Sequence, residues 1–136
     1  MKELWINLPV KDVKKSKAFF AELGFTLNPR FKDTDEAAGL IIGDSQIAVM
    51  LFPEESFRKF TNHDIADTSK GTEVLISVDA QSREEVDQLI AKAEKAGGTV
   101  FTRPEGSGWM YGAGFTDLDG HRWNVLFMDT SKIPSK

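Results

Sequence analysis

An approximate internal repeat is the feature that most restricts the fold of this 136-residue chain. The segment ELWINLPV (residues 3–10) alternates between apolar and other residues, as a strand with one buried face does, and a helix-forming segment follows it. The segment TEVLISVD (residues 72–79) alternates in the same way and is also followed by a helix-forming segment. When Val10 is placed on Val78, both strands and both helices superpose. The chain is therefore predicted to contain two copies of one structural module.

Each predicted helix has its own start and stop signals. Asp12 can cap the first helix, and Gly24 can end it. SREE (Ser82 to Glu85) has the spacing of a capping box, and the pair Gly97-Gly98 follows the last residues of the helical pattern. These signals fix the position of both helices in the repeat.

Three strand-like segments follow each predicted helix. In the first module they cover residues 25–31, 37–43 and 46–52, and in the second residues 98–104, 108–117 and 121–129. One helix can cover only one face of a four-stranded sheet, so the other face needs a partner. The predicted fold class is α+β: two βαβββ modules that form a curled mixed sheet with a central groove and helices outside.

The predicted organisation is a single domain over residues 1–136. Module one spans about 1–53, a linker about 54–70, module two about 71–129, and a loose tail 130–136. A short helix is expected in the linker around Phe57 and Phe60.

Composition excludes several classes of function. The chain has 40% hydrophobic and 28% charged residues, which is typical of a folded globular protein. No apolar run reaches the ~18 residues of a membrane span, and the N-terminal segment has no apolar signal-peptide core. The net charge is −4, and the basic run KDVKKSK (residues 11–17) suits a solvated helix face, so nucleic acid is not an expected partner. The absence of cysteine fits a cytoplasmic protein.

Residues facing the predicted groove are the candidates for function. Alternation places Trp5 and Asn7 on this face in module one, and superposition of the modules makes Trp5 the counterpart of Glu73. Trp5 could stack on a ligand or fill space, and Asn7 could bind a ligand or form structural hydrogen bonds. Glu73 could be a catalytic general base, pair with a cationic ligand or with an arginine (Arg103 or Arg122), or form a structural ion pair.

The segment GWMYGAGF (residues 108–115) places two aromatic residues among glycines. Trp109 and Tyr111 share one face of this predicted strand and could form a pocket wall, although core packing or a subunit interface would also explain them. Arg103 lies in a glycine-containing segment that resembles a flap, where it could anchor an anionic ligand. His121 is expected to stabilise the turn before the last strand, and His63 to lie in solvent.

Three segments in order resemble the vicinal-oxygen-chelate superfamily, which includes glyoxalase I, bleomycin-resistance proteins and extradiol dioxygenases. They are LPVKDVKKSKAFFAELGF (residues 8–25), EVLISVD (73–79) and the closing hairpin FTDLDGHRWNVLFMD (115–129). The resemblance implies that active relatives hold a divalent metal with ligands from the first and last strands of each module. It places those ligand positions on Trp5, on Val49 or Met50, on Glu73 and on Asn124. Tryptophan is no metal ligand, and a neutral amide or thioether suits a divalent metal poorly, so no metal site is predicted.

The sequence therefore predicts a metal-free protein, without cofactor, that holds a small, partly aromatic or cationic molecule. The predicted ligand-binding residues are Trp5, Asn7, Glu73, Arg103, Trp109, Tyr111 and Asn124, and a homodimer is expected. The alternative is a metal-dependent lyase or isomerase, such as a lactoylglutathione lyase, or a dioxygenase, with a rearranged ligand set for Zn, Ni, Mn or Fe. A fold that serves only protein–protein interaction would be favoured if Trp109 and Tyr111 lay on an exposed convex surface.

Overall fold

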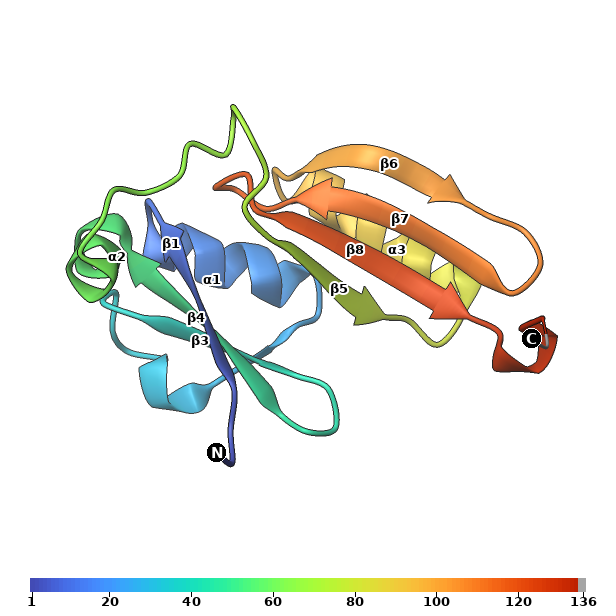
Figure 1. Cartoon of the computed structure of the whole chain (residues 1–136), viewed down its shortest axis with the longest axis horizontal. Coiled ribbons are helices and arrows are strands. Elements are labelled where there is room, and N and C mark those ends of the chain that lie inside the picture. The colour runs from blue at the N-terminus through green and yellow to red at the C-terminus, as the bar shows by residue number, and fades with distance from the viewer. Residues whose placement is uncertain (135–136) are drawn as a thin grey trace. The chain divides into compact units, whose positions relative to one another are not determined.

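The structure, a computed structural model, describes residues 1–134. The chain divides into two compact units, one from Met1 to Gly71 and the other from Thr72 onward (Figure 1). Among the described residues, no helix combines the length and apolarity that a membrane crossing requires.

The first unit is a four-stranded mixed sheet with two helices that pack against it. Its elements are β1 (Trp5–Val10), α1 (Val13–Glu22), β2 (Thr26–Leu27), a 3-10 turn η1 (Pro29–Phe31), β3 (Ala38–Ile42), β4 (Ile47–Pro53) and α2 (Glu54–Thr61). The strand order is β1-β4-β3-β2, with β1 parallel to β4 and the other pairs antiparallel.

The second unit repeats this topology. It contains β5 (Leu75–Asp79), α3 (Arg83–Lys95), β6 (Thr99–Glu105), β7 (Met110–Thr116), β8 (Arg122–Met128) and a 3-10 turn η2 (Thr130–Lys132). The strand order is β5-β8-β7-β6, with β5 parallel to β8. The predicted pair of βαβββ modules, each with a four-stranded mixed sheet, is confirmed.

The predicted caps start and end both long helices. The Asp12 side chain accepts a hydrogen bond from the Lys15 amide at 3.0 Å, and Gly24 takes a left-handed φ of +88° after α1. The Ser82 hydroxyl accepts a hydrogen bond from the Glu85 amide at 3.1 Å. The Glu85 carboxylate accepts in return from the amide of Gln81 at 2.8 Å, one residue before the cap.

The second strand of the first unit is much shorter than predicted. Residues 25–31 were expected to be extended, but only Thr26–Leu27 pair in the sheet. The Asn28 side chain accepts from the Arg30 amide at 3.0 Å, and Pro29 starts the 3-10 turn η1. A side-chain hydrogen bond of this local kind competes with the sheet ladder, and proline has no N–H for the ladder.

The predicted linker helix is present as α2, and the Phe60 ring packs edge-to-face on Phe52 of β4 with ring centroids 4.9 Å apart. Within the predicted tail (130–136), Thr130–Lys132 form the turn η2, which the Asp129 side chain caps, and residues 135–136 lie outside the described part of the chain.

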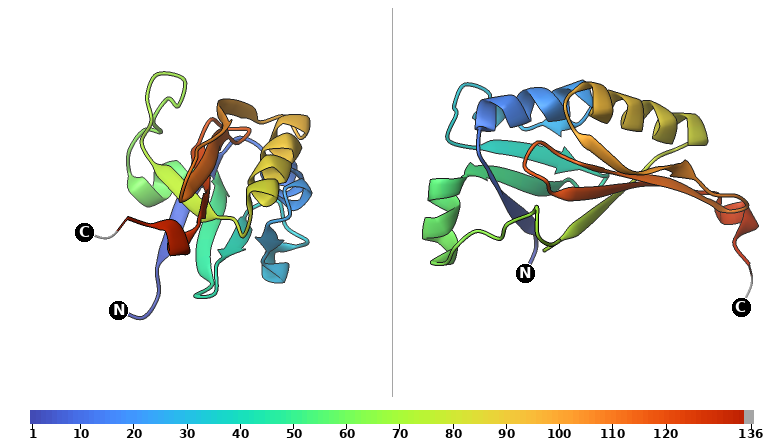
Figure 2. Two further views of the ribbon diagram at one scale, coloured as in Figure 1. Left: turned by 90° about the vertical axis from the view of Figure 1, so that its right-hand side faces the viewer. Right: turned by 90° about the horizontal axis from the view of Figure 1, so that it is seen from above.

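The core of the second unit lies between α3 and one face of its sheet (Figure 2). Phe115 and Trp123 are fully buried there, with stacked rings 6.3 Å apart. Ile76 pairs with Trp123 across β5 and β8, so the apolar set of β5 faces α3, as the alternation predicts.

The opposite face of this sheet, not covered by α3, is called the open face below. Its residues include Ser77, Gly112, Gly114, Arg122, Asn124 and Leu126.

Candidate ligand-binding site

Asn124 lies near the middle of the open face, on β8. It stands between Ser77 of β5 and Gly114 of β7, its partners in the two neighbouring strands. The side-chain nitrogen of Asn124 donates to the Ser77 hydroxyl at 3.5 Å, which is a long hydrogen bond. The amide is therefore only loosely held, and its oxygen is available to another partner.

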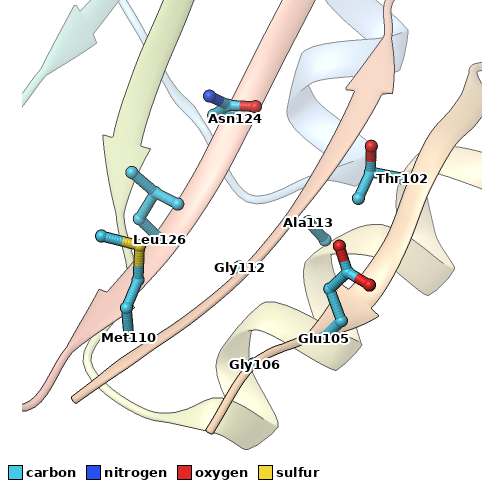
Figure 3. Close-up of a pocket in the computed structure, with 8 residues that line it drawn as sticks. All are labelled: Thr102, Glu105, Gly106, Met110, Gly112, Ala113, Asn124 and Leu126. Carbon is cyan, nitrogen blue, oxygen red and sulfur yellow. The ribbon is translucent and has the colours of Figure 1, made fainter. Parts of the chain in front are cut away.

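A pocket of about 440 Å³ opens beside Asn124 on this face (Figure 3). Gly112 and Ala113 lie at its floor, between a wall of Met110 and Leu126 and a wall of Thr102 and Glu105 (Figure 3). Its volume falls within the range of about 300–1,000 Å³ that is usual for small-molecule sites. The lining combines apolar side chains with a carboxylate, a hydroxyl and an amide.

Glycine at position 112 keeps this pocket open. A Cβ atom added there would lie 2.5 Å from Cδ2 of Leu126 and 3.1 Å from the Val125 carbonyl oxygen. Any other residue would therefore push Leu126 out of place. Gly106, at the pocket edge, has a φ of +131°, and a Cβ there would lie 2.3 Å from the Met110 carbonyl oxygen.

Glu73 is joined to His121 at one end of the second sheet. A Glu73 Oε1 atom lies 3.0 Å from His121 Nδ1, and the His121 ring is buried. The two arginines that were considered as partners bond elsewhere: Arg103 pairs with Glu94, and the Arg122 guanidinium lies 4.5 Å from the Phe101 ring centroid. The geometry matches the structural ion-pair alternative, with histidine as the partner.

Asp117 completes this cluster from the turn between β7 and β8. One carboxylate oxygen accepts from the backbone amides of Asp119 and His121, both at 3.0 Å, and the other accepts from Trp123 Nε1 at 3.1 Å. Burial raises the pKa of the Asp117 carboxyl, while His121 and these hydrogen bonds act in the opposite direction. Asp117 therefore organises the turn from inside the fold.

Tyr111 and Arg103 lie on the helix side of the second sheet. The Tyr111 hydroxyl donates to the Asp87 carboxylate of α3 at 2.7 Å, and the Arg103 guanidinium donates to the Glu94 carboxylate of α3. Tyr111 pairs with Phe127 across β7 and β8, so it points away from the face that carries Asn124. Tyr111 was expected to line the same pocket as Asn124, but the two side chains lie on opposite faces of the sheet.

Trp109 lies in the hairpin between β6 and β7, which α3 holds in place. The Arg83 guanidinium donates to the Gly108 carbonyl oxygen at 3.3 Å and lies 5.1 Å from the centroid of the Tyr111 ring. Trp109 and Tyr111 are both half-buried, so they do not form the exposed convex surface that an interaction-only fold would need.

The remaining predicted residues belong to the first unit. Trp5 is 65% exposed, and Asn7 is also exposed. Met50 pairs with Asn7 and shares its face, whereas Val49 is buried on the helix side. Of the two candidates for the ligand position on this strand, Met50 is therefore the one that shares a face with Asn7.

Several pocket residues were not among the sequence candidates: Thr102, Glu105, Met110, Gly112 and Leu126. Leu126 shares the alternation of Asn124 on β8, and that signal would have identified it. Thr102 and Glu105 depend on irregular pairing between β6 and β7, which has no sequence signature here.

The family model described as the Glyoxalase/Bleomycin resistance protein/Dioxygenase superfamily matches residues 4–125 of the chain. The chain belongs to this superfamily. A solved structure of a hypothetical protein from S. aureus is 38% identical, covers 93% of this chain and 94% of that one, and superposes with a TM-score of 0.82.

More distant solved structures share the fold. A glyoxalase/bleomycin resistance protein/dioxygenase family enzyme from Burkholderia phytofirmans is 19% identical over 90% of this chain and 94% of that one, with a TM-score of 0.72. A genomically encoded fosfomycin resistance protein from Listeria monocytogenes is 20% identical over 90% of this chain and 87% of that one, with a TM-score of 0.63. No curated protein matches the sequence significantly.

The side chains at the superfamily's ligand positions do not fit a divalent metal. The Trp5 side chain has no atom that coordinates a metal, and Met50 offers only a thioether. The Asn124 amide is hydrogen-bonded to Ser77, and the Glu73 carboxylate is hydrogen-bonded to His121. Within residues 1–134, no group of three or more His, Cys, Asp and Glu side chains could hold a metal ion. Divalent metals in proteins require several carboxylate, imidazole or thiolate donors converging on one point. That the protein acts without a metal stays a prediction.

Proposed function

We propose that this protein binds a small organic molecule, without a metal, in the pocket on the open face of its second unit. The observation that carries the proposal is the pocket beside Asn124, with its glycine floor, apolar wall and a few polar groups. Sites for small molecules have this composition: an apolar lining for affinity and a few polar atoms for orientation.

Binding without chemistry suits this lining better than catalysis. Glu105 is its one ionisable side chain, and the lining holds no serine, lysine or histidine that could form a nucleophile–base pair with it. The superfamily joins enzymes with resistance proteins, so membership is compatible with binding alone.

A thermal-shift screen of small molecules tests this function, because a ligand selective for the folded state raises the melting temperature. At least one organic compound should stabilise the wild type, and Asn124→Ala should reduce that shift. His63→Ala, which alters an exposed side chain of the first unit, should leave it unchanged. If Zn²⁺, Ni²⁺, Mn²⁺ or Fe²⁺ stabilises the protein at a stoichiometric ratio, the metal-dependent lyase or dioxygenase replaces this proposal.

We also propose that the protein is a cytoplasmic homodimer. Large apolar side chains are exposed on the edge strands or beside them: Leu4 (58%), Trp5 (65%) and Leu75 (50%). In each unit, a second copy of the chain could cover these apolar side chains. Light scattering at micromolar concentration should give twice the monomer mass, and a monomer mass would overturn the dimer.

A further inference from the structure

The pocket on the open face carries a negative charge, and no cationic side chain is part of its lining. Glu105 is its only charged lining residue, and among the described residues this carboxylate has no ion-pair partner. The arginines of the second unit are engaged elsewhere: Arg83 on Tyr111, Arg103 on Glu94 and Arg122 on Phe101. An anionic ligand would be repelled by the Glu105 carboxylate, and the pocket lining offers it no cationic side chain.

The polar atoms of the pocket are mostly hydrogen-bond acceptors. An ionised carboxylate such as Glu105 only accepts, and a hydroxyl such as Thr102 can accept or donate. The Asn124 nitrogen is directed to Ser77, and its oxygen lies on the side of the pocket that faces Thr102 (Figure 3). A ligand that satisfies these atoms must bring donors.

The opposite wall is apolar. Met110 and Leu126 stand across the Gly112 floor from Glu105 and Thr102 (Figure 3). A ligand in this pocket therefore meets acceptors on one side and hydrocarbon or thioether groups on the other.

We propose that the ligand is an organic cation with an apolar body. Its ammonium-type group lies against Glu105 and Thr102, and its body lies over Gly112 against Met110 and Leu126. This inference rests on the proposed function and names the class of molecule that the same site selects.

The test uses three probes with a common phenethyl body: phenethylamine, phenethyl alcohol and 3-phenylpropionate. Their affinities for the full chain are measured by calorimetry at low salt, for the wild type, Glu105→Gln and Glu84→Gln. Glu84 is the matched control, because it is an exposed glutamate of α3 outside the pocket lining.

The amine should bind the wild type about fivefold more tightly than the alcohol, as expected for an exposed charge pair. The acid should bind most weakly. Glu105→Gln should abolish the preference for the amine, Glu84→Gln should retain it, and 0.5 M salt should narrow it.

Equal affinity of the amine and the alcohol would overturn the cationic class, and a preference that survives Glu105→Gln would overturn the contact of the ammonium group with Glu105. In both cases the proposed function would stand, because the probes still bind. If none of the three probes binds at millimolar concentration, the result counts against both the cationic class and the pocket as a ligand site.

Discussion

The Glu73 carboxylate and the buried His121 ring are hydrogen-bonded, with Oε1 and Nδ1 3.0 Å apart. Glu73 lies just before β5, and His121 ends the turn between β7 and β8. The bond therefore fixes the start of the second module to its closing hairpin. Active relatives are expected to place a metal ligand at the position of Glu73. In this chain the Glu73 carboxylate has a structural partner instead.

Removal of the ring should destabilise the protein more than neutralisation of the carboxylate. His121→Ala leaves a cavity and should cost about 2 kcal/mol or more in the free energy of unfolding. Glu73→Gln keeps an acceptor and should cost about 0.5–1 kcal/mol, because Glu73 is partly exposed. Urea unfolding of both single variants and the double variant measures the coupling, and additive losses would show that the two side chains do not interact.

Asp117→Asn should destabilise the fold because it places an amide nitrogen opposite the Trp123 indole N–H or the backbone amides. One unsatisfied buried donor costs about 1–3 kcal/mol. Gly114→Ala, which changes no titratable group, is the control for the pH dependence of this loss.

The size of the Asp117→Asn effect should depend on pH. Burial raises the pKa of Asp117 in the folded state above the ordinary value of an aspartate, so the folded protein holds this proton more tightly than the unfolded chain. This contribution to stability is complete below the unfolded pKa and is lost as pH rises through the folded pKa. The loss caused by Asp117→Asn should therefore be largest at the lowest pH and shrink as pH rises, and a loss that grows with pH would contradict the assignment.

Tyr111 is the only tyrosine of the chain, so the ultraviolet absorbance of tyrosinate reports this residue alone. Its hydrogen bond to Asp87, with a smaller effect of burial, raises the pKa of the phenol above 10.0. In Asp87→Asn the titration should move down toward the ordinary value. A wild-type titration already at the ordinary value, or one unchanged by Asp87→Asn, would show that the bond to α3 is absent in solution.

Two glycines of β7 form a matched pair of substitutions. A Cβ at Gly112 would meet Leu126 in the pocket at 2.5 Å, whereas a Cβ at Gly114 would meet the Phe101 ring, outside the pocket lining, at 2.3 Å. Gly112→Ala should weaken the binding of a screened ligand at least tenfold. Gly114→Ala should destabilise the fold by about 1–3 kcal/mol through overpacking while it leaves that affinity within about twofold. Equal effects on binding would mean that the Leu126 wall is not the contact surface.

The repeat, the helix caps and the closing turn were readable from the sequence because each depends on neighbouring residues. The orientation of Tyr111 was also within reach, since the turn over residues 117–120 sets Phe115 opposite Trp123 and hence Tyr111 opposite Phe127. The pocket wall of Thr102 and Glu105 could not be predicted from the sequence. The pairing of β6 with β7 shifts register between Val100 and Thr102 and again before Glu105. Such shifts follow from packing in three dimensions and not from a local pattern.

Chemical-shift mapping with a ligand from the screen shows directly whether the open face of the second unit binds that ligand. In the ¹⁵N-labelled protein, saturating ligand should shift the backbone amides of Gly112, Ala113 and Leu126 and the side-chain amide of Asn124. The amides of α3 near Asp87 and Glu94, on the other side of the sheet, should move least. Shifts concentrated on α3, or stoichiometric binding with no shift at Gly112 and Asn124, would contradict a ligand site on the open face.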